Sequence, residues 1–337
     1  MQENPATPVA LAVDFGGTKV EAALVDAEGQ ILASSRQRRP TGVESTSDEL
    51  AASVVDVATR ALAVLPAGTS LLGAGIGCAG PIDLFGGTVS PVNIPAWRGF
   101  PLRDLVGSVL SDLFDPDLVD PVLSDRGEHP AVHLAIDGLA YTLAEHWVGV
   151  GRGVANMMGM VVSTGVGGGL VLGGRPVHGA AGNAGHIGHI EVSALEGEPT
   201  FGHAGTLEAV ASGPHSVAWA RRQGWTGTTG EELARDYALG HEVARAAIRR
   251  SGTAIGQAIC SATALLDLDL VVVGGGFSQA TPDLFGFIRE TVAAHHFEYV
   301  RRVRVVPSTL SGTGPLVGAA ALVHLPNELV NPIRAAM

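Results

Sequence analysis

The sequence predicts an α/β protein built from two related domains, and three observations lead to this fold class. The chain has 337 residues, which is long enough for two domains that each have their own core. Hydrophobic residues make up 46% of the chain and charged residues only 16%, a balance typical of a well-buried enzyme. A strand, a glycine-rich turn carrying Thr and another strand occur at residues 9–25 and again at 157–172. This repeat predicts that the second half of the chain echoes the first.

Composition and charge exclude several classes of protein. Cys78 and Cys260 are the only cysteines and both lie in apolar runs, which leaves neither a disulfide framework nor a cysteine-based zinc cluster. The formal charge of -12 disfavours a nucleic-acid partner, because a polyanion is bound by clustered Lys and Arg. The start MQENPATPVA has no targeting pattern, and no apolar run is long enough to span a membrane. We therefore expect a cytoplasmic protein with no membrane partner.

In the first half, residues 9–37 alternate apolar and polar positions between the turn clusters FGGT and DAEG. This pattern predicts three strands in an antiparallel meander. A helix is expected from about Ser47 to Leu65, a buried strand from Leu71 to Cys78, and a second helix from Leu102 to about Phe114. Residues 115–130 are rich in Asp and Pro without any period, so they predict an exposed connection and a domain boundary.

The second half repeats this order. Its expected elements are a strand at Val132–Ile136, a helix over LAYTLAEHW, strands over MMGMVV and LVL, a helix from Thr206, a long helix at 241–266, a strand over LDLVVV and a final helix over GPLVGAAALVHL. We predict a smaller N-terminal domain at 1–130 and a larger one at 131–314. A C-terminal helix at about 315–337 is expected to pack back on the first domain.

Three glycine-rich turns follow strands and are candidates for holding phosphate. They contain Asp14, Gly16, Gly17, Thr18 and Lys19, then Thr164, Gly165, Gly167 and Gly168, and then Gly274, Gly275 and Gly276. Glycine permits positive φ and lets backbone N–H groups approach phosphate oxygens. The first two turns lead into strands, so they match neither a Rossmann fingerprint nor a Walker A loop. Each turn alone is explained by a hairpin, whereas the set favours a nucleotide site with Asp14 near Mg²⁺ or its waters.

Eight segments in order resemble the ROK family of sugar kinases and sugar-responsive repressors. They are DFGGTK, GIGCAGPID, NIPAW, AIDGLAYTLAE, STGVGGG, GNAGHIGH, GTLEAVASG and LVVVGGG, within about residues 9–322. The resemblance implies two ribonuclease-H-like domains of the actin and hexokinase superfamily flanking an interdomain cleft for ATP and a hexose. It implies an enzyme of the glucokinase or N-acylhexosamine kinase type that uses ATP with Mg²⁺.

The resemblance also assigns roles to individual residues. Asp137 matches the family's catalytic Asp, a general base that takes the proton of the attacking sugar hydroxyl. From its position alone it could equally be a helix N-cap. Asn93, His189 and Glu208 match positions that contact sugar hydroxyls, and His186 stands where the kinases carry Glu. Taken singly, these side chains are explained by a loop, a packed His and a first-turn acid.

Several positions depart from the family pattern. Ile136 and Leu139 replace two Asn residues around the catalytic Asp, which we interpret as favouring an apolar substituent on the sugar. The three cysteines that complete the family's zinc site are replaced by Pro199, Phe201 and Thr206. His186, His189 and His203 remain, whereas a structural zinc site has four N or S ligands. We therefore expect no structural zinc, with Phe201 and Pro199 packing the loop instead.

The sequence is also compatible in part with three other functions. A repressor is disfavoured because only about eight residues precede the first strand. A catalytically silent sugar-binding protein would explain Ile136 and His186 but leaves the acids and glycine turns unused. A polyphosphate-using kinase is disfavoured by the charge. We expect a sugar and ATP as small-molecule partners and a homodimer or higher homo-oligomer.

Overall fold

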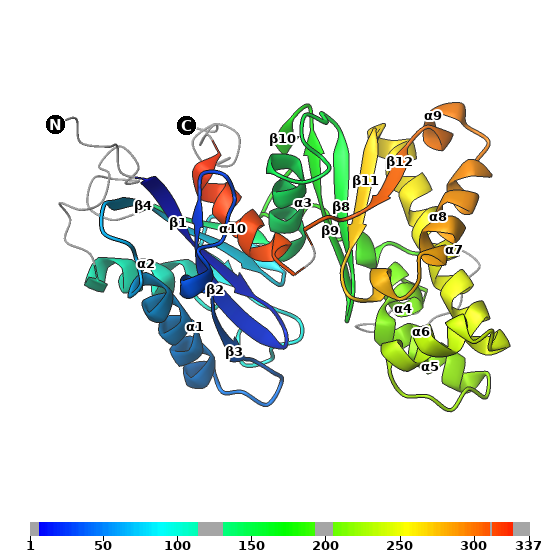
Figure 1. The fold of residues 1–337 in the computed structure, drawn as a ribbon, viewed down its shortest axis with the longest axis horizontal. Coiled ribbons are helices and arrows are strands. Elements are labelled where there is room, and N and C mark those ends of the chain that lie inside the picture. The colour runs from blue at the N-terminus through cyan, green and yellow to red at the C-terminus, as the bar shows by residue number, and fades with distance from the viewer. Residues whose placement is uncertain (1–6, 114–130, 193–204, 311, 326–337) are drawn as a thin grey trace. The chain divides into compact units, whose positions relative to one another are not determined.

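Two β-sheets with the same strand order organise the protein (Figure 1). The computed structural model describes residues 7–113, 131–192, 205–310 and 312–325. The chain divides into two units. The first comprises Met1–Gly149, Arg175–Ala184 and Gly312–Met337, and the second comprises Val150–Gly174 and Gly185–Ser311.

The sheet of the first unit has the strand order β3-β2-β1-β4-β7. Its strands are β1 (Thr7–Phe15), β2 (Lys19–Asp26), β3 (Gln37–Pro40), β4 (Thr69–Cys78) and β7 (Val132–Ile136). The predicted antiparallel meander is confirmed, since β2 pairs antiparallel with both β1 and β3. The third strand begins later than predicted, because Ala33–Ser35 form a 3₁₀ turn. Ser35 Oγ accepts a hydrogen bond from Leu24 N (2.8 Å) and donates one to Leu32 O (2.6 Å).

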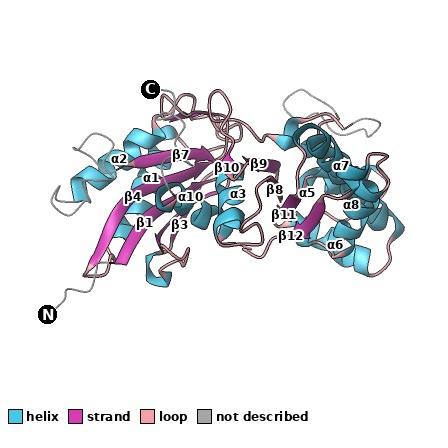
Figure 2. Ribbon diagram, turned by 90° about the horizontal axis from the view of Figure 1, so that it is seen from above, coloured by secondary structure: helices cyan, strands magenta, loops and turns pink. Residues whose placement is uncertain are grey.

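Helices cover this sheet and bring the end of the chain back to it. They are α1 (Ser47–Leu62), α2 (Leu102–Leu113), α3 (Asp137–Trp147) and α10 (Gly314–His324), and a small ribbon is formed by β5 (Ile82–Asp83) and β6 (Thr88–Val89). Helix α1 starts at a capping box between Thr46 and Glu49, which satisfies free N–H groups of the first turn. Helices α3 and α10 lie side by side next to the strands (Figures 1 and 2).

Helix α10 is buried against its neighbours because small residues line the contact. A Cβ added to Gly318 would lie 1.8 Å from Ala140 O of α3, and one added to Gly75 of β4 would lie 1.8 Å from Ala319 O of α10. The expectation that the C-terminal helix packs on the first domain agrees with this arrangement.

The boundary predicted at residue 130 lies further along the chain. Strand β7 pairs in parallel with β4, and α3 packs on α10, so both belong to the first unit. Sequence reasoning assigned them to the second domain because 115–130 has the composition of a linker. That segment lies outside the described residues.

The sheet of the second unit has the order β10-β9-β8-β11-β12. Its strands are β8 (Met157–Val162), β9 (Val166–Leu172), β10 (Arg175–Pro176), β11 (Leu270–Gly274) and β12 (Arg304–Pro307). The order of its third, second, first, fourth and fifth strands repeats that of the first sheet. The pairing also repeats, because β8–β9 is antiparallel while β8–β11 and β11–β12 are parallel.

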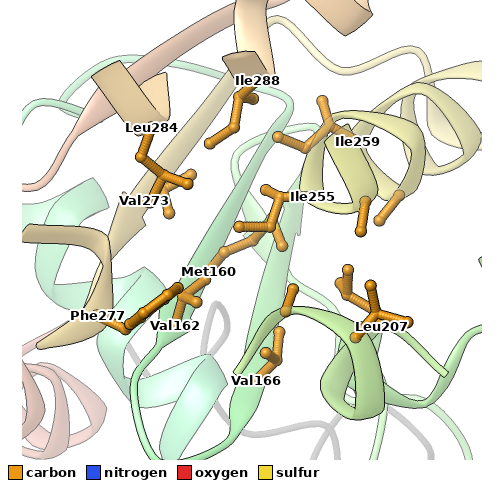
Figure 3. Close-up of a cluster of buried hydrophobic side chains, with 14 of the residues drawn as sticks. Met160, Val162, Val166, Leu207, Ile255, Ile259, Val273, Phe277, Leu284 and Ile288 are labelled. Atoms are coloured by element: carbon orange, nitrogen blue, oxygen red, sulfur yellow. The ribbon is translucent and has the colours of Figure 1, made fainter. Parts of the chain in front are cut away.

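Helices enclose the core of the second unit on this sheet (Figure 3). They are α4 (Leu207–Ala211), α5 (Gly213–Arg222), α6 (Gly230–Ala238), α7 (Glu242–Leu266), α8 (Asp283–Ala293) and α9 (Glu298–Arg301). Ile255 of α7 and Ile288 of α8 are fully buried with Met160 of β8 and Val273 of β11. In the parts of the chain that the structure describes, no helix combines the length and apolar character needed to span a bilayer.

Candidate active site

The first glycine turn joins β1 to β2 and is held by its own backbone. Gly16 N donates to Lys19 O (2.9 Å), and Thr41 Oγ1 donates to Gly16 O (2.8 Å). Neither Gly16 nor Gly17 has a positive φ, so conformational freedom is not the reason for glycine here. A Cβ on Gly17 would lie 3.3 Å from Asn93 Cβ, which shows that the missing side chain lets Asn93 approach the turn.

Asn93 is exposed beside this turn because the residues after it are anchored in the core. Ile94 and Trp97 are fully buried. The Trp97 ring stacks on Phe15 at the end of β1, with centroids 4.3 Å apart, and on Phe100 at 4.0 Å. The structure therefore brings together two parts of the predicted site, Asn93 and the first glycine turn.

Asp14 and Asp137 follow the same edge of the first sheet. Asp14 lies near the carboxyl end of β1, and Asp137 comes directly after β7, two parallel steps away across β4. Asp14 is 7% exposed. Burial, and then the negative charge of Asp137, raise the pKa of Asp14 from 3.8 to about 7. A buried carboxylate of this kind is stabilised as an anion by a nearby cation.

Asp137 is exposed and is the first residue of α3. The N-cap of this helix is Ile136, which has no side-chain cap. Asp137 Oδ1 instead accepts a hydrogen bond from Gly138 N (2.7 Å). The N-cap alternative for Asp137 is therefore wrong, although an acid in the first turn still suits the helix dipole.

The two apolar departures next to Asp137 are core residues. Ile136 is 2% exposed and Leu139 is fully buried. The interpretation that they create an apolar neighbour for the sugar is not supported, because neither side chain reaches an accessible surface. Their apolar character suits their burial.

The second glycine turn is shorter than predicted. Ser163, Thr164 and Gly165 form the turn, and β9 starts at Val166. Gly168 lies within β9, where a Cβ would come 2.7 Å from Gly159 O of β8 and 3.1 Å from Ile187 Cγ2. Close strand packing therefore explains the glycine at 168, and its phosphate contact stays a prediction. Nothing lies within 4 Å of a Cβ placed on Gly167.

Glu208 is fixed on the second turn. Its Oε2 accepts a hydrogen bond from Val166 N (2.9 Å), and a Cβ on Gly165 would lie 2.7 Å from the same oxygen. Helix α4 places Glu208 in its first turn after the N-cap Thr206, whose side chain accepts from Ala209 N. The turn and the first-turn acid, which are far apart in sequence, thus form one unit of structure.

His186 and His189 lie at the two ends of a short 3₁₀ turn over Ile187–His189. Their rings meet edge to face, with centroids 5.8 Å apart. Burial, and then the neighbouring His189, lower the pKa of His186. His186 is therefore neutral near pH 7, and a neutral imidazole donates a hydrogen bond at one ring nitrogen and accepts one at the other.

A cavity of about 590 Å³ opens beside the second and third glycine turns. Its lining comes from the turns, the starts of α5 and α6, and the segment after β11, and includes Ser163, Thr164, Gly213, Thr228, Gly230 and Gly276. Gly275 has φ of 95°, and a Cβ there would lie 2.5 Å from Val162 O. Sequence reasoning identified the glycines of the three turns but did not name Gly213 or Thr228–Gly230 as site residues. The local signal for these is a helix that begins at the glycine of a Ser-Gly or Thr-Gly pair.

Some residues of the loop that we expect to lack zinc lie outside the described residues. His203, Pro199 and Phe201 lie there, so the absence of zinc and the packing role of Phe201 stay predictions. Within the described ranges, no three His, Cys, Asp or Glu side chains group as metal ligands. Thr206, at one of the replaced cysteine positions, serves as a helix N-cap.

Comparison with known proteins identifies the family. The model of the ROK family matches residues 10–111 and 117–325. The chain belongs to the ROK family. The predicted family is thereby confirmed, and the mixed sheets of the two units confirm the predicted α/β fold class.

Individual ROK proteins match over nearly the whole chain. A glucokinase of Halalkalibacterium halodurans is 30% identical, over 93% of this chain and 94% of its own. An N-acetylmannosamine kinase of Escherichia coli is 28% identical, over 92% and 97%. The structure of a ROK family glucokinase from Streptomyces griseus in complex with glucose and AMPPNP superposes with a TM-score of 0.74. It is 28% identical, over 94% of this chain and all of that chain.

Proposed function

We propose that this ROK protein is an ATP-dependent kinase that phosphorylates a hydroxyl of a hexose or N-acyl hexosamine. Family membership supports the reaction class, since the relatives above are named as kinases of glucose and N-acetylmannosamine. The silent sugar-binding alternative is less favoured, because Asp14, Lys19, Asp137 and the three glycine turns leave such a protein with an unused base and phosphate site.

The observation that carries the proposal is the pair of carboxylates at one edge of the first sheet. Asp137 is exposed, as a base must be to reach a substrate, whereas Asp14 is buried. In the proposed reaction Asp137 accepts the proton of the sugar hydroxyl. The hydroxyl oxygen forms a bond to the γ-phosphorus of ATP as the bond to the β-phosphate oxygen breaks, and ADP leaves.

The residues present fit a nucleotide. The cavity beside the second and third turns lies within the range of about 300–1,000 Å³ usual for small-molecule sites. Thr164 and Gly276 line this cavity and Gly165 lies next to it, while Gly274 ends β11 and Gly275 follows that strand. We assign phosphate contacts to residues of these turns, and keep Gly16, Gly17 and Thr18 of the first turn as further candidates for phosphate contact.

Asp14 fits the role of a carboxylate near Mg²⁺. Its raised pKa shows that the anion lacks full stabilisation in the protein alone, and a divalent cation would supply it. When bound, the metal would neutralise phosphate charge. We assign sugar contacts to Asn93, His186, His189 and Glu208, whose side chains suit a polyol.

The test is an ADP-release assay with ATP and Mg²⁺ over a panel of hexoses and N-acyl hexosamines, repeated with polyphosphate as donor. Product formation with ATP and at least one sugar supports the proposal. If calorimetry shows sugar binding but neither donor supports turnover, the protein is a catalytically silent sugar-binding protein. Turnover with polyphosphate but not with ATP would mean that polyphosphate is the phosphoryl donor.

Asp137→Asn tests the base. The variant should lower kcat by roughly 10² to 10⁴ and largely keep sugar affinity in calorimetry, because the amide still fits the helix start. Asp48→Asn, which changes a first-turn acid of α1, should leave kcat unchanged. An Asp137→Asn enzyme with normal kcat would reject Asp137 as the base.

A further inference from the structure

Lys19 is the only lysine of this chain. The sequence has 21 basic residues other than histidine, so the remaining 20 are arginines. Arginine thus serves at every other one of these basic positions. An ammonium has been kept at one place, directly after the first glycine turn.

The Lys19 side chain is held by a buried acid that no sequence motif singled out. Lys19 Nζ donates to Glu21 Oε2. The other oxygen of that carboxylate, Oε1, accepts from Arg36 Nε (3.3 Å) and Nη2 (3.1 Å). The Glu21 side chain is only 4% exposed, whereas that of Lys19 is 29% exposed. The acid is therefore an internal anchor, and the ammonium it holds still reaches solvent.

The strand pairing places Glu21 on the same face of the sheet as Asp14. Side chains two residues apart share a face of a strand, so Lys19 and Glu21 lie on the same face of β2. Glu21 is also directly paired with Asp14 of β1. Lys19 O meanwhile closes the glycine turn by accepting from Gly16 N. One residue thus joins the backbone of the turn to the buried carboxylate.

The charges around Glu21 explain why it can hold Lys19 as an anion. Burial opposes its ionised form, but the hydrogen bond and charge of Lys19 and the charge of Arg36 outweigh this and keep the pKa of Glu21 below its usual value. Arg36 Nη2 also donates to Gly312 O (2.9 Å), just before α10. Arg36 is thus fixed from two sides, and Glu21 keeps a partner even when Lys19 moves.

We propose that Glu21 is a positioning residue that holds the Lys19 ammonium at the first glycine turn for contact with the phosphates of the nucleotide. This inference rests on the proposed kinase function. An ammonium has three N–H donors, and the bond to Glu21 uses one of them. The others remain for phosphate oxygens.

A guanidinium cannot take the place of Lys19 in this arrangement. The fork of Arg36 already occupies Glu21 Oε1, and a second planar fork would need the remaining oxygen and its own space. The compact ammonium uses one oxygen only. Lys19→Arg is therefore expected to impair the enzyme as Lys19→Met does, although it keeps the charge.

A double-mutant cycle tests whether Glu21 acts through Lys19. Glu21→Gln should lower kcat/KM for ATP roughly 10- to 100-fold, the loss expected for a hydrogen bond to a charged group, with sugar affinity unchanged in calorimetry. In a Lys19→Met background the same change should have almost no further effect. Glu28→Gln, at an exposed acid near the other end of the same strand, is the matched control. Equal losses in both backgrounds would mean that Glu21 is merely structural.

The single lysine allows a second measurement that needs no activity. Reductive methylation with ¹³C-formaldehyde labels Lys19 and the N-terminal amine, and Lys19→Met identifies the latter's signal. The Lys19 signal should shift in Glu21→Gln and not in Glu28→Gln. Where Glu21→Gln does not fold, Glu21→Asp, which keeps the charge but withdraws the carboxylate, replaces it.

The two measurements separate the possible failures. If no sugar is phosphorylated but the Lys19 signal depends on Glu21, the proposed function falls and the anchoring stands. If the wild type is active and its Lys19 signal moves with AMPPNP and Mg²⁺ but ignores Glu21, the positioning role is overturned and the kinase stands. An active wild type whose Lys19 signal ignores the nucleotide would also overturn the phosphate contact.

Discussion

At the scale of single residues, the chemistry of the first unit depends on where carboxylates lie relative to solvent. Asp14, Glu21 and Asp137 lie at one edge of one sheet, yet they differ in burial and partners. Glu21 is buried with two cations, Asp14 is buried with its charge poorly balanced, and Asp137 is exposed. Burial, only partly offset by Lys19 and Arg36, raises the pKa of Asp14 to about 7 and so makes its charge state depend on pH near neutrality.

Asp14 should make the protein less stable as pH rises. Its pKa rises from the ordinary value of 3.8 to about 7 in the folded protein, so between these values the folded state holds a proton that the unfolded chain has lost. The free energy of unfolding therefore falls across this window and stays low above it, by at most about 4 kcal/mol at about 1.4 kcal/mol per pKa unit.

Asp14→Asn removes this dependence and checks its sign. The variant should melt at a higher temperature than the wild type at roughly pH 8 and at nearly the same temperature at roughly pH 4. Glu44→Gln, at an exposed acid, should change neither. A variant that is less stable than the wild type at the higher pH would show that ionised Asp14 is stabilised in the fold.

At the scale of elements, glycines let backbones approach each other at the site. In the strand pair β8–β9, Gly168 meets Gly159 O, whereas Gly167 next to it meets nothing. Adjacent strand residues point to opposite faces, so these neighbours have different requirements. Substitutions at Gly168 and Gly167 therefore distinguish a role in strand packing from a role in ligand binding.

Gly168→Ala should destabilise the protein by roughly 1–3 kcal/mol, the usual cost of overpacking. Gly167→Ala should melt close to the wild type. Thermal unfolding with and without AMPPNP measures both properties. If Gly168→Ala keeps its melting temperature and loses only nucleotide binding, the packing role is rejected and the phosphate role predicted for Gly168 is supported.

Helix α10 gives a second prediction at this scale. A Cβ on Gly318 would overlap Ala140 O, three residues after Asp137 in α3. Gly318→Ala should therefore push α3 aside and lower both the melting temperature and kcat. Gly286→Ala, in α8 with open space around it, should cost nothing and gain up to about 1 kcal/mol from helix propensity. Normal kcat in Gly318→Ala would mean that α3 tolerates the shift.

At the scale of the whole molecule, the replaced cysteines predict a ROK protein that folds without zinc. A zinc site contributes roughly 10 kcal/mol or more in small zinc domains, so a protein that relied on one would respond to its removal. We expect substoichiometric zinc in elemental analysis of protein purified without chelator. EDTA should leave the melting temperature and, with Mg²⁺ in excess, the activity unchanged. Stoichiometric zinc would refute this and make His186, His189 and His203 the ligands to test.

The sequence alone determined the order of elements, the repeat of strand, glycine turn and strand, and the family, because apolar period and turn residues are local properties. It also ranked Asp137, Asn93 and Glu208 as candidates. Which residues share a face or a contact was decided by tertiary structure. Gly168 packs on Gly159, Leu139 enters the core, and β7 joins the first sheet through pairing that no local pattern encodes. Glu21 was overlooked for the same reason. Its role depends on its burial and on its contacts with Lys19 and Arg36, which no local sequence pattern encodes.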